Sequence, residues 1–458
     1  MERRKGGRAE GRKASSENRP KADVRSNPSA LPPFRPSDLE VIRDPLWDNI
    51  RLDRPAQLVL DTPAMQRLRY VRQLGHAFLV YPGATHTRFE HALGAYHLTR
   101  RALASLEERG ELAAVGQRDC LAVRLAALLH DIGHYPFSHA LEEAGFPSHE
   151  AQGVAKLTEG DLGLRLGDIG GPELAGEIGA LIRGVSPSPL QGLISGSLDL
   201  DKIDYLSRDA RMCGVPYGTV DVDRLLSSLT LAETAGGRCQ VGVQEKGVSA
   251  LESLLFAKYQ MYRNVYWHHA VRAATCMFKR AARDAVRKGV VSMDAVGDLT
   301  DDGLMEVLTG SGSELARAIR ARRLYKRALD VPATEVTESA DSWAADDPDL
   351  VEEVEDTLAV EAGLEPGELL LDFPTRSSML AVDLPLRTRA GGIEQLTDQG
   401  RAGQLGLPRV ADELYRSARR LRIFTARPAG TDFSTVTRLL RLPAGAVHEH
   451  LATSRPLL

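Results

Sequence analysis

The amino-acid sequence predicts a mainly α-helical protein with a small α+β region at its C-terminal end. Long segments between residues 38 and 330 carry apolar residues at helical spacing. Residues that typically begin or end helices flank several of these segments. Short alternating segments that suit strands appear mainly after residue 365. The chain has 458 residues, 43% of them hydrophobic and 26% charged, which is enough for two or three folded units with a substantial core.

The first 37 residues form a basic segment with ten Lys or Arg and four acidic residues. They carry few apolar residues, so we expect a disordered tail, with a weak nucleic-acid contact as the alternative to a solvated tail. The segment lacks the apolar core of a secretory signal. No apolar run is long enough to span a membrane. The four cysteines are scattered and suit reduced thiols. We therefore expect a cytoplasmic protein without a membrane contact.

Four long helices are expected between residues 38 and 330. Thr87 and Glu90 form a capping box that begins the first of them. Gly133 and Gly214 are placed to end two others, because glycine favours the position that follows a helix. The expected helices are the segments 87–98, 119–133, 201–212 and 248–288, the last of them with one break.

The last third of the chain changes character. Residues 331–365 are strongly acidic, and we interpret them as a linker. Segments 368–373 and 379–384 alternate like strands, so residues 366–458 are expected to form the small α+β region. Minor strands are also expected at 78–81 and 240–243. The predicted domains are thus a tail (1–37), a helical domain (38–330), the linker and the C-terminal region.

The segment LLHDIGHYPFSHALEEAG contains the strongest chemical signal. His130 and Asp131 are adjacent at the end of an otherwise apolar helix. A buried aspartate is costly unless it is paired or binds a metal. Imidazole nitrogen and carboxylate oxygen are both good ligands for a divalent ion. Another histidine lies upstream in TRFEHALG and another aspartate downstream in SLDLDKIDYLSRDA. The alternative is a set of hydrogen-bonded core histidines without a metal.

The order histidine, histidine–aspartate, aspartate resembles the HD superfamily of phosphohydrolases, whose four metal ligands come from separate helices. Transferred to this chain, the ligands are His91, His130, Asp131 and Asp201. The resemblance implies an HD-domain helical bundle that binds a divalent metal ion. Mg, Mn, Fe, Co, Ni and Zn are all compatible with such ligands.

Three segments resemble more closely the deoxynucleoside triphosphate triphosphohydrolases of this superfamily. They are DTPAMQRLRYVRQLGHAFLVYPGATHTRFEHALG, HDIGHYPFSH and DLDKIDYLSRD, and the similarity is strong over about residues 40–215. This resemblance implies hydrolysis of a deoxynucleoside triphosphate to a deoxynucleoside and inorganic triphosphate. It also implies a homo-oligomer, either a dimer or a tetramer.

The same resemblance assigns further site residues. Arg88 lies three residues before His91, on the same helix face, where its planar guanidinium can reach phosphate oxygens. Glu142 lies three residues after His139 and can hold its imidazole as a general acid for the leaving 5′-oxygen. The implied catalytic residues are Arg88, His134, His139, Glu142 and His149. The implied substrate-binding residues are Gln73, Leu74, Arg88, Lys202, Tyr205, Asp209 and Arg263.

Other positions depart from the family pattern. Part of a nucleotide activator site is matched by Asp61, Gln66 and Arg69. However, Glu40, Ser249 and Leu251 stand where basic residues are expected, so activation by the same nucleotide does not follow. A tyrosine that excludes ribonucleotides aligns with Val271, which leaves the choice between deoxynucleotides and ribonucleotides open.

Two other functions remain as alternatives. One is an HD phosphohydrolase that acts on another nucleotide ester, such as a monophosphate, a dinucleoside polyphosphate or a cyclic nucleotide. The other is a nucleic-acid-binding regulatory protein that uses the basic tail. Analysis of the reaction products separates the first alternative from the expected triphosphohydrolase.

Overall fold

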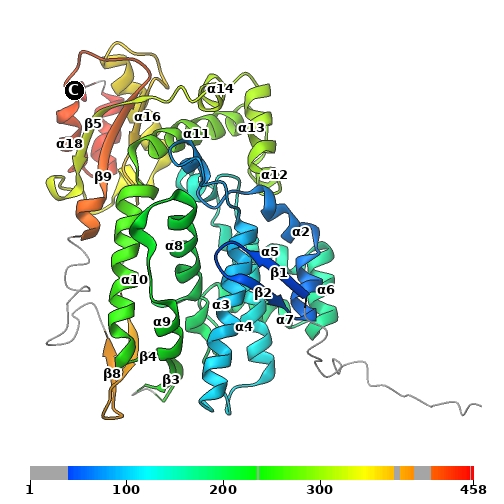
Figure 1. Ribbon diagram of the computed structural model, residues 1–458. Helices are drawn as coiled ribbons and strands as arrows, with labels where there is room; N and C mark the ends of the chain where they lie inside the picture. The colour runs from blue at the N-terminus through cyan, green and yellow to red at the C-terminus, as the bar shows by residue number, and fades with distance from the viewer. Residues whose placement is uncertain (1–39, 235–236, 376–381, 397–413, 454) are drawn as a thin grey trace, which may run out of the picture. The chain divides into compact units, whose positions relative to one another are not determined.

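The computed structural model describes residues 40–234, 237–375, 382–396, 414–453 and 455–458 (Figure 1). Within these residues the protein is mainly α-helical and contains small β-sheets, as the sequence predicts. The predicted disordered tail lies outside the described residues. No helix in the described part of the chain is long and apolar enough to cross a membrane.

The described chain begins with a β-hairpin and a series of short helices. Strands β1 (Glu40–Asp44) and β2 (Asp48–Leu52) pair antiparallel, and Asp53 and Thr62 cap the two helices that follow. The predicted strand at 78–81 is wrong. Residues 75–79 form a 3₁₀ turn instead, because the N–H groups of Ala77 and Val80 bond to carbonyls three residues earlier. The elements after the hairpin are α1 (Arg54–Leu60), α2 (Pro63–Arg67), η2 (Leu68–Tyr70) and η3 (Gly75–Leu79).

A bundle of helices builds the central part. The capping box of Thr87 and Glu90 is present, and α8 ends at Gly214 in the left-handed conformation, as predicted. A π-helical turn over Tyr262–Tyr266 makes the expected break between α10 and α11. The bundle consists of α3 (Arg88–Glu108), α4 (Gln117–Leu129), α5 (His149–Thr158), α6 (Gly160–Gly170), α7 (Leu174–Ile182), α8 (Leu200–Cys213), α9 (Val222–Ser228), α10 (Val248–Met261) and α11 (His269–Arg287).

Helix α4 ends earlier than the sequence suggested. Its last residue is Leu129, and His130 and Asp131 already belong to the turn that follows. Gly133 does not end the helix; it allows the start of α5 to approach closely. A Cβ atom at Gly133 would lie 2.1 Å from the carbonyl oxygen of His149. The HD pair, His130 and Asp131, therefore lies close to the beginning of α5.

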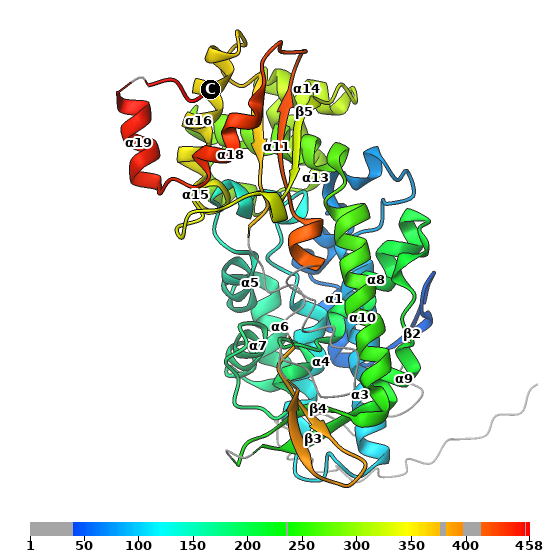
Figure 2. The ribbon, with the colours of Figure 1, turned by 90° about the vertical axis from the view of Figure 1, so that its left-hand side faces the viewer.

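Two further sheets lie toward the end of the chain. Strand β9 is central in the antiparallel order β5–β9–β6, and this sheet contacts α11 and α16 (Figures 1 and 2). Strands β7 and β8 instead extend the β3–β4 pair, with β4 and β7 parallel. The strands are β3 (Leu229–Glu233), β4 (Cys239–Gln244), β5 (Lys326–Pro332), β6 (Leu369–Asp372), β7 (Leu384–Arg387), β8 (Ile393–Leu396) and β9 (Arg420–Thr425).

The prediction of an acidic linker over residues 331–365 is wrong. Leu350, Val354 and Leu358 form a fully buried stripe on helix α16, and the acidic side chains of this helix pair with arginines of α11. The predicted strand 368–373 is confirmed as β6. The first half of the segment 379–384 lies outside the described residues, and its last residue, Leu384, begins β7. The helices of this part are α12 (Met293–Val296), α13 (Asp301–Gly310), α14 (Glu314–Arg320), α15 (Trp343–Asp346), α16 (Pro348–Glu361), α18 (Val436–Leu439) and α19 (Ala444–Ala452).

Candidate active site

The imidazole of His91, in the first turn of α3, faces that of His130, in the turn that follows α4. His91 Nδ1 lies 2.8 Å from Asp204 Oδ2, and His130 Nδ1 lies 2.9 Å from the carbonyl oxygen of Ala127. Both acceptors favour a proton on Nδ1, so both Nε2 atoms present lone pairs. These two Nε2 atoms are only 3.1 Å apart. Two facing lone pairs repel each other unless a proton or a metal cation lies between them.

Asp131 completes this group. Its carboxylate oxygens lie 3.3 Å from His130 Nε2 and 3.7 Å from His91 Nε2. Burial alone would raise the pKa of Asp131, but the charges of Arg88, His130 and His134 hold that pKa well below its usual value. The ligand atoms of His91, His130 and Asp131 all lie within 4.8 Å of one another. Two neutral imidazoles and one carboxylate thus form a donor set that fits a divalent metal ion.

The predicted fourth ligand, Asp201, is not among these close ligand atoms. It lies in the first turn of α8, and its charge helps to raise the pKa of His91, which burial alone would lower. Burial and the neighbouring Asp201 raise the pKa of Asp199 well above its usual value. Lys202 Nζ donates to Asp199 at 2.6 Å and to the carbonyl oxygen of Gly196 at 2.7 Å. Lys202 is therefore held beside acidic groups.

A second cluster contains four of the predicted catalytic residues. His139 lies in η4 (Ser138–Ala140), Glu142 in η5 (Glu142–Ala144), and His149 begins α5. Glu142 Oε1 lies 3.0 Å from Nδ1 of both His139 and His149. Burial would raise the pKa of Glu142, but these hydrogen bonds hold it well below its usual value. His134 Nε2 lies 3.2 Å from Asp131 Oδ1 and so links the cluster to the first group.

This second cluster suits proton transfer better than metal binding. The rings of His134 and His149 stack with centroids 3.8 Å apart and an interplanar angle of 14°. Lone pairs in two nearly parallel planes do not converge on one ion. The side chain of His139 is 60% exposed, whereas its Nδ1 atom is held by Glu142. Its Nε2 atom is the one that remains to exchange a proton with a ligand.

A cavity of about 540 Å³ opens beside these groups. It is lined by seven predicted site residues: Gln73, Leu74, Arg88, His139, Glu142, Tyr205 and Asp209. Arg88 donates from Nη1 to Asp131 Oδ2 at 2.6 Å. It therefore connects the cavity wall with the metal group, which consists of His91, His130 and Asp131. The buried Oε1 atom of Gln73 has no hydrogen-bond partner within the described residues. A donor group on a ligand is the natural partner for this oxygen.

Asp209 is held by residues that sequence reasoning missed. Its carboxylate lies 2.8 Å from His86 Nε2 and accepts a hydrogen bond from the Tyr266 hydroxyl at 2.7 Å. The neighbouring Arg208 does not pair with Asp209. Arg208 instead pairs with Asp204 and with Asp44 of β1. Tyr266, like the predicted position Val271, lines the cavity.

Two predicted substrate-binding residues do not line this cavity. They are Lys202 and Arg263, and Arg263 is exposed with its Nη1 atom donating to the Tyr259 hydroxyl. Lys258, one turn earlier on α10, is buried instead. Burial lowers the pKa of Lys258 to about 8, and the nearby charge of Lys202 contributes to this. The spacing of Lys258 with Leu251 and Leu254 places it on an apolar helix face, which was a signal available in the sequence because a lysine is almost never buried unless it is paired.

Comparison with known proteins identifies the family. The model of the HD domain matches residues 88–209, and that of the HD associated region matches residues 220–401, so the two meet inside the predicted 38–330 domain. An uncharacterized protein of Methanocaldococcus jannaschii is 37% identical over 292 residues, which cover 64% of this chain and 60% of that protein. The deoxynucleoside triphosphate triphosphohydrolase SAMHD1 of Gallus gallus is 30% identical over 343 residues, 63% of this chain and 56% of SAMHD1. The chain thus spans little more than half the length of these relatives.

Solved structures share the fold. A phosphohydrolase from Bacteroides thetaiotaomicron superposes with a TM-score of 0.67 at 22% identity, covering 85% of this chain and all of that one. A hypothetical protein from Aquifex aeolicus gives a TM-score of 0.64 at 28% identity over 85% of this chain and 97% of that one. The matched HD domain and HD associated region, together with the sequence relatives, show that the chain belongs to the HD-domain phosphohydrolase family.

Proposed function

We propose that this protein is a metal-dependent hydrolase that converts a deoxynucleoside triphosphate to a deoxynucleoside and inorganic triphosphate. The observation that supports this most is that one cavity is lined by Arg88, His139 and the Asp209–Tyr266 pair. Arg88 contacts the metal group, His139 belongs to the second cluster, and Asp209 suits a sugar hydroxyl. The volume of about 540 Å³ is in the range of sites for small-molecule ligands.

The groups around the metal site suit attack at the α-phosphorus. A divalent ion held by His91, His130 and Asp131 would polarise a phosphoryl oxygen and activate water. Arg88 uses Nη1 on Asp131 and Nε on Ser138, so its remaining N–H groups can donate to phosphate. His139, held at Nδ1 by Glu142, would protonate the leaving 5′-oxygen from Nε2. Each residue thereby has a separate part in one displacement.

The remaining phosphates need cationic partners. Lys202 and Lys258 lie outside the cavity wall but near Asp201 in the first turn of α8, and we assign to them the phosphates that extend beyond the cavity. The two ammonium groups are close enough for the charge of one to lower the pKa of the other. Asp199 and Asp201 offset part of this repulsion. A bound polyphosphate would complete the neutralisation, in the way that fixed cations stabilise charge on transferred phosphoryl groups. In this proposal Lys258 takes the part that the sequence resemblance gave to Arg263.

Analysis of the products tests the reaction class. Incubation with each deoxynucleoside triphosphate and several divalent metals should give deoxynucleoside and triphosphate in equal amounts. The same panel with ribonucleoside triphosphates shows whether the enzyme selects the sugar. In water labelled with oxygen-18, the label should enter the triphosphate, because attack occurs at phosphorus. A deoxynucleoside monophosphate as first product, or label in the nucleoside, would contradict the proposal. Hydrolysis of a different nucleotide ester would support the other phosphohydrolase function.

The sugar pocket gives a second prediction. Asp209 already accepts from His86 and Tyr266, so loss of the substrate 3′-hydroxyl does not leave this buried carboxylate unpaired. We expect the loss of one hydrogen bond, about 0.5–1.5 kcal/mol, or about threefold to tenfold in kcat/KM for a 2′,3′-dideoxy substrate. In Asp209→Ala both substrates should react at similar, low rates. The check is kcat/KM for dGTP and dideoxy-GTP with both proteins; an unchanged ratio in the variant would remove Asp209 from the sugar pocket.

A further inference from the structure

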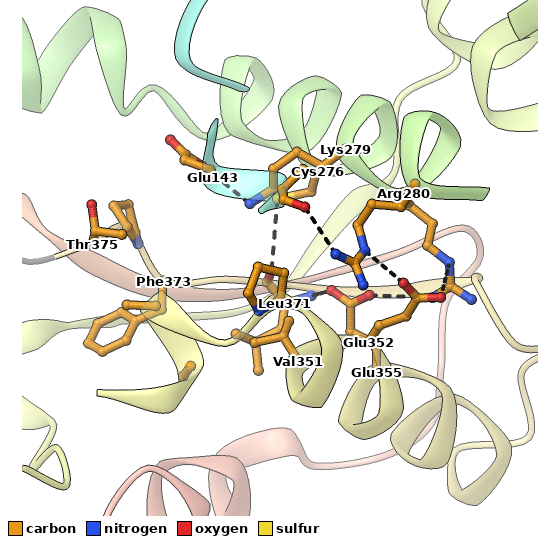
Figure 3. A pocket seen from close by; sticks show the side chains of 16 residues that line it. Glu143, Cys276, Lys279, Arg280, Val351, Glu352, Glu355, Leu371, Phe373 and Thr375 are labelled. Atoms are coloured by element: carbon orange, nitrogen blue, oxygen red, sulfur yellow. Dashed lines mark hydrogen bonds and ion pairs between the residues drawn. The ribbon is translucent and has the colours of Figure 1, made fainter. Parts of the chain in front are cut away.

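Glu143 follows the catalytic cluster residue Glu142 but pairs with cations of α11 and not with the histidines. Its carboxylate accepts hydrogen bonds from Arg272 at 2.9 and 2.7 Å and from Lys279 at 3.2 Å. Both cations belong to α11. Figure 3 shows the carboxylate of Glu143 turned toward the Lys279 side chain, above strand β6. The short turn η5 therefore presents one glutamate to the histidines and the next one to α11.

Arg272 is held in turn by the sheet β5–β9–β6. Asp372, the last residue of β6, is fully buried and accepts from Arg272 Nη2 at 2.7 Å and from Nε at 3.0 Å. The same carboxylate accepts from Arg422 of β9 at 3.3 Å, and Arg422 also donates to the carbonyl oxygen of Trp267 at 2.9 Å. A continuous path of hydrogen bonds thus runs from the sheet to Glu143.

Helix α11 also holds the backbone of η5. Arg283 Nη1 donates to the carbonyl oxygen of Ala144 at 3.0 Å. The next residue, Gly145, has a φ of +89°, which closes the turn in a conformation that glycine favours. Because η5 is only three residues long, contacts at Glu143 and Ala144 fix the backbone that carries Glu142. Glu142 then sets the orientation of His139 and His149.

The charges in this path are costly for stability alone. A buried ion network is often no more stable than apolar residues of similar size, although removing one partner is strongly destabilising. Arg272, Glu143 and Asp372 also adjoin the cavity, because Arg272 and Glu143 line it and Pro374 and Thr375 follow Asp372 in its wall. The charged hydrogen bonds of Arg272 with Glu143 and Asp372 are directional, so they fix the positions of these side chains in a way that apolar packing does not.

We propose that Glu143, Arg272 and Asp372 are positioning residues through which the β5–β9–β6 sheet fixes the Glu142–His139 pair beside the cavity. This inference rests on the proposed function in one respect, namely that His139 protonates the leaving group. It assigns a function to the C-terminal region, because the sheet would hold the proton donor His139 at a fixed position relative to the metal group. A displacement of about 1 Å in such a group can lower a rate about a hundredfold.

The test compares two substrates that differ in their need for a proton donor. Asp372→Asn and Glu143→Gln should lower kcat for dGTP about tenfold to hundredfold and change KM little. Bis(p-nitrophenyl) phosphate has a leaving group that departs without protonation. Both variants should therefore hydrolyse it less than about threefold more slowly than the wild type, because they disturb only the proton transfer. Arg272→Lys keeps the charge but loses the two-pronged contact, and should give an intermediate loss.

A double-mutant comparison shows whether these residues act through His139. On a His139→Ala background, Asp372→Asn should cause almost no further loss with dGTP, because the group that it positions is absent. The matched control is Arg280→Gln, which removes a buried arginine of the same helix that pairs with Asp356 and Glu352 of α16. This variant should lower the unfolding temperature without a difference between the two substrates.

Several outcomes would overturn the inference. They are equal losses with both substrates in Asp372→Asn and Glu143→Gln, additive losses with His139→Ala, or the same substrate-dependent loss in Arg280→Gln. If the wild type hydrolyses another nucleotide ester instead of dGTP, the proposed function fails. The double-mutant comparison on that ester then decides on the positioning residues separately.

Discussion

A protein with His130→Ala and Asp131→Ala is expected to bind no divalent metal and to show no hydrolysis of any nucleotide. The two residues supply one of the two facing imidazole lone pairs and the adjacent carboxylate. His91 alone then remains in the close group, and one imidazole is a weak site for a divalent ion. Metal content after dialysis against a chelator and readdition of Mn, together with product formation, measures both effects.

The same change also affects stability. Arg88 and Asp131 are both buried and 2.6 Å apart, so removal of the carboxylate leaves an unpaired guanidinium. Breaking a buried pair in this way costs about 3–5 kcal/mol. The companion variant Asp131→Asn keeps an oxygen that can accept from Arg88, and should fold with less loss while it still binds metal weakly. Helical content by circular dichroism distinguishes loss of metal from loss of fold.

His139→Ala is the control that separates metal binding from the proton transfer. This side chain is mostly exposed and does not belong to the close metal group. The variant should keep its metal and lose most of its activity with dGTP, about a hundredfold or more, because general acid catalysis contributes on this order. Full turnover in the double variant of the HD pair, with added Mn, would remove these two residues from the metal site.

Local signals in the sequence predicted the parts of the site that depend on neighbours along the chain. The capping box at Thr87 places His91 in the first turn of α3, and Gly214 ends α8 as expected. The position of Glu142 three residues after His139 predicted their contact, which the structure shows at 3.0 Å. Each of these features is decided within about four residues, so the residue pattern alone was sufficient.

Contacts between distant segments could not be predicted in this way. Gly133 looked like a helix end, but glycine is needed there because the backbone of His149 approaches closely. The residues around position 133 give no indication of that contact. The acidic segment 331–365 looked like a linker because its charges were counted without their partners on α11. The buried stripe of Leu350, Val354 and Leu358 at intervals of four residues was the signal for a packed helix.

Asp204 is distant in the sequence from the metal-binding residue His91 but contacts the Nδ1 atom of its ring. Its fully buried carboxylate accepts from His91 Nδ1 and from Arg208, and the indole N–H of Trp47 donates to it as well. A Cβ atom at Gly94 would lie 1.8 Å from Asp204 Oδ1, so only glycine leaves room for this carboxylate. A carboxylate in this place fixes the ring and the proton position of a metal-binding histidine.

Asp204→Asn is therefore expected to lower the affinity for the divalent metal about tenfold to hundredfold, the usual effect of losing such a partner. The amide is neutral, and it cannot accept from His91 and from both nitrogens of Arg208 with the same strength. The matched control is Asp44→Asn, because Asp44 is the other carboxylate on Arg208 and does not contact His91. Both variants leave Arg208 with one charged partner, so both should lower the free energy of unfolding by a similar amount. Metal affinity, measured by competition with a chelator of known affinity, should fall in Asp204→Asn alone. Equal affinities in the two variants would show that Asp204 serves the fold and not the metal ligand.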